Sequence, residues 1–395
     1  MKSLASIIGV GESEIGSVPG KNNIQLCAEA AVAALKDAGL NKSDIDGVLV
    51  NDSYVESHAR RVLQFAEYFG IPVPQLKFVD NVHLGAVAVS GLMVHLASML
   101  VQVGMCSNVL VVGGDNLLTG RGGRRNAITR MAMNRQAQFE NQYGPTTITQ
   151  FALVAQRHMY EYGTTSEQLA AVAVALRKHA SLHPKAQMRS LITVEDVLSS
   201  RMISSPLHLL DCSMISDSAW ALVVSRAQTA EVAGHKPVQV LGYGEGFSDG
   251  KGYVTDTVST VASLTDFGGI AQASRRAMEM ADVTHKDIDV LFCYDPFTIW
   301  PIVNIEEIGF CKKGEGGAFV QGGRIELGGE LPLNPHGGLH SYCHSGVAGG
   351  GHMFVEAALQ LRGQGAERQV KDAQVALVQG YGSQVGMFPC TVLGS

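Results

Sequence analysis

The sequence predicts an α/β protein made of two similar halves, in which helices cover both faces of a parallel-rich sheet. Short apolar segments alternate with helical segments along most of the chain, and continuously apolar strands are typical of sheets buried on both faces. The pattern of residues 1–115 returns in residues 233–395. The chain has 395 residues, enough for two such units, because single cores rarely grow beyond about 250–300 residues.

The first half is expected to alternate short strands with long helices. Each expected strand is a brief apolar run, and residues 24–40 place apolar residues at helical spacing. Residues 83–103 are apolar almost throughout, which indicates a buried helix. In chain order, the expected elements are a strand over 4–10, a helix over 24–40, strands over 48–50 and 77–79, a helix over 83–103 and a strand over 109–112.

An internal duplication explains the second half. Residues 44–52 read DIDGVLVND and residues 287–295 read DIDVLFCYD. Each segment follows an alanine-containing helical stretch and ends a strand at an acidic residue. The first half's long helix and its last strand are echoed by a helix from residue 352 and a strand over 374–378. Such self-similarity indicates that one βα unit was duplicated.

A segment of different composition lies between the halves. It is rich in Arg, Gln, Thr and Met, with few strand signals and a helix predicted over 166–177. We interpret it as an inserted loop domain. The predicted division is an N-terminal half (1–115, completed by 200–232), a loop domain (116–200) and a C-terminal half (233–395).

Composition excludes several functional classes. A formal net charge of −6 argues against a nucleic-acid surface. The best candidate for a membrane span, residues 84–103, is interrupted by Ser90, Gly91 and His95, so no span is expected. Residues 1–16 have too short an apolar core for a secretory signal. Seven scattered cysteines without a CxxC pair are typical of a reducing cytoplasm, with neither disulfides nor a zinc knuckle.

Residues 332–364 hold the strongest functional signal. Asn334 and the pair Gly337-Gly338 begin a polar, glycine-rich elbow that continues through His344 and leads into a helix. An elbow of this kind before a buried helix N-terminus can bind an anion or a developing oxyanion. The alternative is a tight connection without chemistry, and composition alone does not separate the two.

The same stretch resembles the C-terminal signature of the thiolase superfamily in its sterol-carrier-protein branch, N-P-x-G-G followed by G-H-P-x-G. The matching residues are Asn334, Pro335, Gly337, Gly338 and His344. Cys343 replaces the glycine before the family histidine, and Ser345 replaces the proline after it. Residues 162–187 and 191–225 resemble the same branch. The resemblance implies the thiolase fold, a duplicated five-layered α-β-α-β-α arrangement with an inserted loop domain, assembled as a homodimer.

The thiolase nucleophile has no counterpart in the sequence. A thiolase needs a thiolate to take the acyl group, a histidine to activate it, a second base and donors for the thioester oxygens. The family places its cysteine just before the Ser-Gly that opens the long helix, which is Ser90-Gly91 here. Ala88 falls near the cysteine position, and no cysteine lies between Cys27 and Cys106. We interpret the absence as native, with an engineered replacement as the alternative, and keep Ser90 as a binding residue.

A tyrosine replaces the polar residue of the second family motif. Tyr-Asp-Pro-Phe begins at Tyr294, where the family has Asn-Glu-Ala-Phe or His-Asp-x-Phe at the end of a strand. The phenol can donate a hydrogen bond to an enolate oxygen or, with a lowered pKa, remove a proton. Alternatively, the ring packs and the hydroxyl meets solvent. Asp295 is a second catalytic candidate in this motif. The family's third motif, Cys-x-Gly-Gly-Gly near the C-terminus, supplies its second base, and residues 379–384 read QGYGSQ here, so that cysteine is also absent. Gly382 is kept as a binding residue, and Tyr381 is either a replacement acid or base or a structural turn residue.

Loss of both thiols makes the sequence similar to thiolase-like retro-aldolases of steroid side-chain breakdown. Such enzymes cleave a β-hydroxyacyl-CoA without an acyl-enzyme, and they work with a small OB-fold protein that often carries a zinc ribbon. They carry a tyrosine at the position of Tyr294, and a second tyrosine near the histidine that is not clearly matched here. The alternatives are a β-ketothiolase that uses Cys343 and a non-catalytic scaffold subunit.

The resemblance implies that coenzyme A is part of the substrate, with no permanently bound cofactor. Four histidines recur between residues 336 and 352, but Gly337-Gly338 interrupts the helix that would align them, so no metal site is expected. The predicted catalytic residues are Tyr294, His344 and Asp295. The predicted CoA-binding residues are Asn334, Gly337, Gly338, Ser90 and Gly382.

Overall fold

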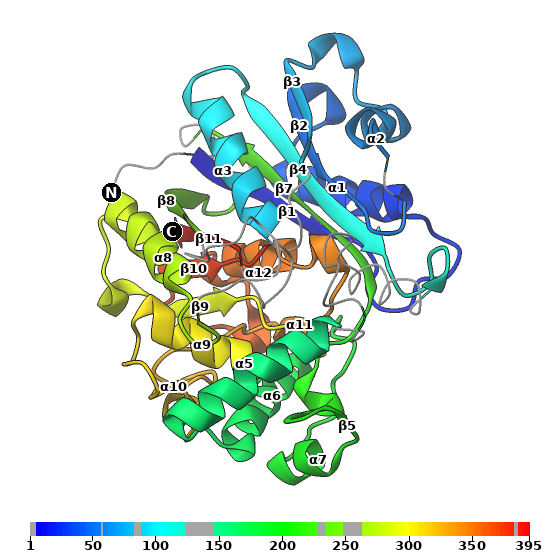
Figure 1. Ribbon diagram of the computed structural model, residues 1–395. Helices are drawn as coiled ribbons and strands as arrows, with labels where there is room; N and C mark the ends of the chain where they lie inside the picture. The colour runs from blue at the N-terminus through cyan, green and yellow to red at the C-terminus, as the bar shows by residue number, and fades with distance from the viewer. Residues whose placement is uncertain are drawn as a thin grey trace.

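Helices cover both faces of a nine-stranded sheet (Figure 1). The computed structural model describes residues 5–56, 58–82, 88–123, 142, 146–226, 234–247, 263–382 and 386–395. The strands of the sheet are β1 (Ala5–Glu12), β2 (Gly47–Asn51), β3 (Phe78–Val82), β4 (Asn108–Asn116), β7 (Asp217–Ser225), β8 (Val238–Phe247), β9 (Val290–Cys293), β10 (Val375–Gln379) and β11 (Met387–Gly394). Their order across the sheet is β3-β2-β4-β7-β1-β8-β11-β10-β9. A separate hairpin pairs β5 (Met202–Ser204) with β6 (Leu207–His208).

The helices form three layers around the two halves of this sheet. They are α1 (Asn23–Ala38), α2 (Arg61–Phe69), α3 (Ala88–Gln102), α5 (Thr147–Tyr162), α6 (Ser166–Ser181), α7 (Val194–Ser199), α8 (Gly268–Ala281), α9 (Ile299–Ile308), α10 (Gly316–Phe319), α11 (Gly338–Ser341) and α12 (Gly351–Leu361). Helix α1 packs on β1, β4 and β7, and α8 packs on β8 and β11. Helices α3 and α12 contact strands of both halves and therefore lie between them. The predicted five-layered thiolase fold is confirmed.

The expectation of a parallel-rich sheet is wrong. Strand β2 runs parallel to β3 and β4, and β9 runs parallel to β10. The pairs β1–β7, β4–β7, β1–β8, β8–β11 and β10–β11 are antiparallel. Continuous apolar strands indicate burial on both faces, and here the central and outer helices bury antiparallel strands as completely as parallel ones. A continuously apolar strand therefore indicates that helices cover both faces of the sheet, and it does not indicate whether the strand is parallel or antiparallel to its neighbours.

The elements predicted from periodicity are present with small shifts. Helix α1 starts one residue earlier than expected because Asn22 and Gln25 form a reciprocal capping box, and it ends where Gly39 adopts the left-handed conformation. The long helix expected from residue 83 is described from Ala88, and residues 83–87 lie outside the described part of the chain. The limits of the three predicted domains remain predictions. Within the described residues, no helix is both long and apolar enough to cross a membrane.

Two features of this fold position the site. Strands β9 and β10 are parallel and end side by side, so the residues after them meet at one edge of the sheet. The glycine-rich elbow, residues 334–344, hydrogen-bonds to β9 through the Asn334 N–H, which donates to the Leu291 carbonyl at 2.9 Å. Helix α5, from the inserted region, packs against the β5–β6 hairpin and against α9, the helix that follows β9.

Candidate active site

Tyr294 and His344 meet at the carboxyl end of β9. Tyr294 directly follows this strand, and its N–H donates to the Gln379 carbonyl at the end of β10. The Tyr294 hydroxyl lies 3.2 Å from Nε2 of His344. Both side chains are buried, with exposed fractions of 5% and 3%. The pairing that the two sequence motifs imply is thus present in the structure.

The surroundings of His344 determine its tautomer. Nδ1 lies 3.1 Å from the carbonyl oxygen of Met214 and 3.1 Å from Oγ of Ser213. A carbonyl oxygen only accepts hydrogen bonds, so Nδ1 carries the proton. Burial lowers the pKa of His344 to about 4, opposed in part by the Met214 carbonyl, so the imidazole is neutral near pH 7. Nε2 is therefore a lone pair that accepts the Tyr294 hydroxyl.

Tyr294 is held as a neutral phenol by its surroundings. Burial, followed by nearby Tyr54 and Asp295, raises the pKa of Tyr294 well above its ordinary value. Its ring stacks on that of Tyr381, with centroids 5.4 Å apart and planes 9° from parallel. Tyr381 also packs against Trp300, so its contact restricts the orientation of the Tyr294 ring. This contact supports the structural reading of Tyr381 over that of a replacement acid or base.

Asp295 supports the elbow and does not reach the cavity described below. Its oxygens accept hydrogen bonds from the Leu339 N–H at 3.0 Å, the His340 N–H at 3.4 Å and the Asn334 side chain at 3.0 Å. Burial raises the pKa of Asp295 well above its ordinary value, and the two backbone donors oppose that rise. With its oxygens occupied in this way, Asp295 anchors the elbow, and its catalytic role remains a prediction.

The two glycines of the elbow are required by close packing. Gly337 and Gly338 have φ values of 103° and 63°, which side chains rarely adopt. A Cβ on Gly338 would lie 2.2 Å from Oδ2 of Asp295, and one on Gly337 would lie 2.5 Å from Cβ of Ala180. The backbone approaches a carboxylate and helix α6 at these positions. Close packing is therefore sufficient reason for the glycine pair, and its contact with CoA remains a prediction.

Sequence reasoning missed the segment that joins these parts. Residues 212–216 lead into β7, and their backbone bonds to both sides of the site. The Ser213 N–H donates to the Pro296 carbonyl, and the Met214 N–H donates to the Leu339 carbonyl. The Ser216 N–H donates to the His344 carbonyl at 2.9 Å, while the His344 N–H donates to Oγ of Ser216 at 3.0 Å. The segment reads CSMIS, and the available signal was its two serines, Ser213 and Ser216, just before a buried strand.

Tyr294 and His344 open onto a cavity of about 290 Å³. Its lining comes from the start of α5, the β5–β6 hairpin, the 212–216 segment and the end of β9. The lining residues are Thr146, Thr147, Ile148, Arg201, Ile203, Leu209, Cys212, Ser213, Met214, Ile215, Tyr294, Pro296, Phe297 and His344. Apolar groups form most of the wall, and the polar side chains are those of Tyr294, His344 and Ser213, of Thr146 and Thr147 at the start of α5, and of Arg201. This shape suits an apolar substrate with one reactive polar centre.

The predicted CoA-binding residues do not line this cavity. Asn334 is fully buried and exchanges hydrogen bonds with the backbone of Cys293. Gly382 is buried and exchanges two backbone hydrogen bonds with Met387, at 2.9 and 3.2 Å. Ser90 is also buried, and its hydroxyl has no hydrogen-bond partner among the described residues. Residues 83–87 and 383–385, next to Ser90 and Gly382, lie outside the described residues, so the CoA-binding roles of these two remain predictions.

The cysteine that the structure brings to the cavity is Cys212. Burial and the neighbouring Asp211 raise the pKa of Cys212 to about 12, so it is a thiol near pH 7. Its sulfur lies 3.2 Å from the His208 carbonyl, to which the thiol donates. Cys343, which the sequence singled out, is 1% exposed and does not belong to the lining among the described residues. Its position beside His344 in sequence does not bring it to the cavity, because its side chain packs with Ala180, Ala186 and Tyr342.

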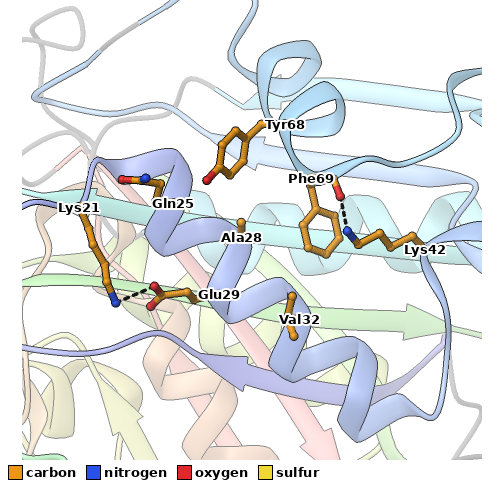
Figure 2. A pocket seen from close by; sticks show the side chains of 8 residues that line it. All are labelled: Lys21, Gln25, Ala28, Glu29, Val32, Lys42, Tyr68 and Phe69. Atoms are coloured by element: carbon orange, nitrogen blue, oxygen red, sulfur yellow. Dashed lines mark hydrogen bonds and ion pairs between the residues drawn. The ribbon is translucent and has the colours of Figure 1, made fainter.

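A larger hollow of about 510 Å³ lies between α1 and α2 (Figure 2). Its two lysines already have partners. Lys21 pairs with Glu29 at 2.6 Å, and Lys42 donates to the Phe69 carbonyl and lies 4.4 Å from the centre of that ring. Its lining includes no histidine, cysteine or hydroxyl other than Tyr68. Across the described part of the chain, no group of three or more His, Cys, Asp or Glu side chains is arranged to hold a metal ion.

A duplicated α/β fold with a buried Tyr–His pair at its sheet edge defines an enzyme of the thiolase type. Residues 250–395 match the family described as "Thiolase C-terminal domain-like". The chain is 34% identical over 372 residues to a 17-hydroxy-3-oxo-4-pregnene-20-carboxyl-CoA lyase of Mycobacterium tuberculosis, covering 91% of this chain and 92% of the relative. It is 32% identical over 387 residues to an acetyl-CoA acetyltransferase of Methanothermobacter thermautotrophicus, covering 96% and 97%.

A solved structure extends this comparison to three dimensions. The Ltp2-ChsH2(DUF35) aldolase superposes with a TM-score of 0.84 at 31% identity, covering 99% of this chain and 97% of that one. The chain therefore belongs to the thiolase superfamily, in the thiolase-like branch that includes aldolases.

Proposed function

We propose that this enzyme cleaves a β-hydroxyacyl-CoA by a retro-aldol reaction, without an acyl-enzyme. The observation that carries the proposal is the Tyr294–His344 pair, which faces an apolar cavity with no thiolate beside it. A neutral histidine that accepts a hydrogen bond from a tyrosine forms a base relay, because the tyrosine oxygen can take a proton while its own proton moves to the imidazole. The lyase and aldolase relatives support the same reaction class.

The reaction requires one proton to move and one bond to break. The substrate's β-hydroxyl gives its proton to the Tyr294 oxygen, and the Tyr294 proton passes to Nε2 of His344. The bond between Cα and Cβ then breaks, the β-carbon becomes a carbonyl, and the electron pair forms a thioester enolate. The proton returns through Tyr294 to Cα, which gives a shortened acyl-CoA.

The environment of the Tyr294–His344 pair explains why the two proton transfers at Tyr294 occur together. Burial makes a tyrosinate costly, so Tyr294 must release its own proton while it accepts that of the substrate. His344 supplies the lone pair for that step. The charge on the imidazolium appears as the enolate forms and disappears when Cα is protonated, so the site returns to its starting state.

The test is product analysis with a panel of β-hydroxyacyl-CoA and β-ketoacyl-CoA esters. We expect β-hydroxyacyl-CoA to yield a ketone or aldehyde and a shortened acyl-CoA, identified by mass spectrometry. Thiolytic cleavage of β-ketoacyl-CoA, with no cleavage of β-hydroxy esters, would contradict the proposal. It would favour the acyltransferase, the second candidate, which is supported by the acetyltransferase relative and by Cys212 in the cavity.

We further propose that the enzyme is a cytoplasmic homodimer that works with a small OB-fold partner. All seven cysteines are free, as expected in a reducing compartment. The solved aldolase contains a DUF35 component beside the thiolase-like chain, which supports a partner here. An obligate dimer interface buries more than about 2,000 Å². Sedimentation at micromolar concentration should give a dimer, and a monomer would contradict this assembly.

A further inference from the structure

We infer that Ser213 is a third catalytic residue, whose hydroxyl donates a hydrogen bond to the thioester oxygen as the enolate forms. The inference rests on the proposed function and names a group that the sequence motifs do not contain. Ser213 lines the cavity beside His344, and its side chain is half-buried. Its backbone N–H donates to the Pro296 carbonyl at 2.9 Å, so the residue is tied to the segment that follows Tyr294 while its hydroxyl contacts His344.

The hydrogen atoms around His344 determine what the Ser213 hydroxyl can donate to. Because the Met214 carbonyl requires a proton on Nδ1, that N–H also faces Oγ of Ser213 at 3.1 Å. Ser213 must therefore accept in this contact. Its own hydroxyl hydrogen is left without an acceptor among the hydrogen bonds of the described residues. A hydroxyl on a cavity wall whose hydrogen is unused is available to the substrate.

The two residues of the base relay cannot supply this donor. The Tyr294 hydrogen points to Nε2 of His344, and Nε2 has no hydrogen of its own in the resting state. Cys212 directs its thiol to the His208 carbonyl. An enolate oxygen that forms in an apolar cavity needs a donor within hydrogen-bond distance, because a bare anion is costly there. Arg201, Thr146 and Thr147 also line the cavity, but among the described lining residues Ser213 is the hydroxyl whose contact with His344 places it beside the relay.

The contact with His344 makes this donor strongest when it is needed. Once His344 takes the proton from Tyr294, it becomes an imidazolium, and its Nδ1–H pulls more strongly on the Ser213 oxygen. The Ser213 hydrogen becomes a better donor at the moment when negative charge develops on the thioester oxygen. An interaction that is stronger in the transition state than in the ground state accelerates the reaction.

The test compares Ser213→Ala and Ser213→Thr with the wild type, and Ser181→Ala serves as the control. Ser181 lies at the end of α6, where its hydroxyl bonds to the Lys178 carbonyl, so the control removes the same group away from the cavity. We expect Ser213→Ala to lower kcat by about 10²-fold, as for other oxyanion donors. Ser213→Thr, which keeps the hydroxyl, should recover most of the rate. The Kd for acetyl-CoA, measured by calorimetry, should change less than about threefold.

A second measurement separates this inference from the proposed function. Enolate formation also exchanges the Cα hydrogens of acetyl-CoA for deuterium in D₂O, without any C–C cleavage. Ser213→Ala should slow this exchange by a factor similar to its effect on kcat. If the wild type exchanges but cleaves no β-hydroxy ester, the proposed function fails while the Ser213 role stands. If Ser213→Ala cleaves and exchanges like the wild type, the Ser213 role fails alone.

Two other outcomes would also overturn the role of Ser213. A loss that appears in KM and Kd with kcat unchanged would make Ser213 a binding contact for the CoA arm. A change of the His344 tautomer in Ser213→Ala, read by nitrogen NMR on histidine-labelled protein, would make Ser213 a positioning residue. We expect the tautomer to persist, because the Met214 carbonyl still faces Nδ1 in the variant.

Discussion

Replacing Tyr294 with phenylalanine tests the base relay directly. The change removes one oxygen and keeps the ring, so the stacking on Tyr381 is retained. It leaves Nε2 of His344 without its donor, which costs about 1–3 kcal/mol of stability. The loss of a positioned acid–base group costs about 10²- to 10⁴-fold in rate. The effect on turnover should therefore be much larger than the effect on folding.

The assay is kcat/KM on a β-hydroxyacyl-CoA that the wild type cleaves, together with the midpoint of thermal unfolding. Tyr160→Phe makes the same chemical change at a side chain that is 81% exposed, and it should match the wild type in both measurements. His344→Ala should lower kcat/KM by a similar factor. Because the two residues form one relay, the double variant should be little slower than the slower single variant.

Two results would refute this reasoning. Tyr294→Phe with near-normal kcat/KM would show that the phenol is not part of the proton path. Fully additive losses in the double variant would show that Tyr294 and His344 act independently, and the hydrogen bond between them would then have no catalytic meaning.

Three further predictions follow from the described geometry. Burial lowers the pKa values of His179 and His344 to about 4, so the unfolded chain binds protons more readily than the folded one. The free energy of unfolding should therefore fall as the pH drops from about 6.5 to 4. A melting temperature that stays constant across that pH range would contradict these pKa values. Incubation with acyl-CoA should leave no thioester on Cys212, whose thiol has a pKa of about 12; an adduct by intact mass would revive the acyltransferase. In denaturant unfolding, Gly338→Ala should destabilise the fold by more than about 2 kcal/mol, because the new Cβ would lie 2.2 Å from a carboxylate oxygen of Asp295. Gly363 also has a positive φ, 71°, but open space around it, so Gly363→Ala should cost about 1 kcal/mol. Equal losses in the two variants would show that the clash at Gly338 is absent.

The sequence alone was enough for the layers and the family. Apolar periodicity is a local property, so the helix at α1 and the strands β2 and β4 could be read from short windows of residues. The repeat of residues 44–52 at 287–295 indicated two halves, and motif positions singled out Tyr294 and His344. These signals are carried by residue type and spacing, which need no knowledge of which segments meet.

The tertiary structure decided the strand directions and the division of labour at the site. Sequence motifs made Asp295 a catalytic candidate and Gly338 a ligand contact, yet these two residues pack against each other under the elbow. Ser213 stands 131 residues from His344 along the chain, and no local pattern links them. A histidine's tautomer and a serine's free hydrogen depend on which carbonyl lies within about 3 Å, and only the folded chain sets those distances.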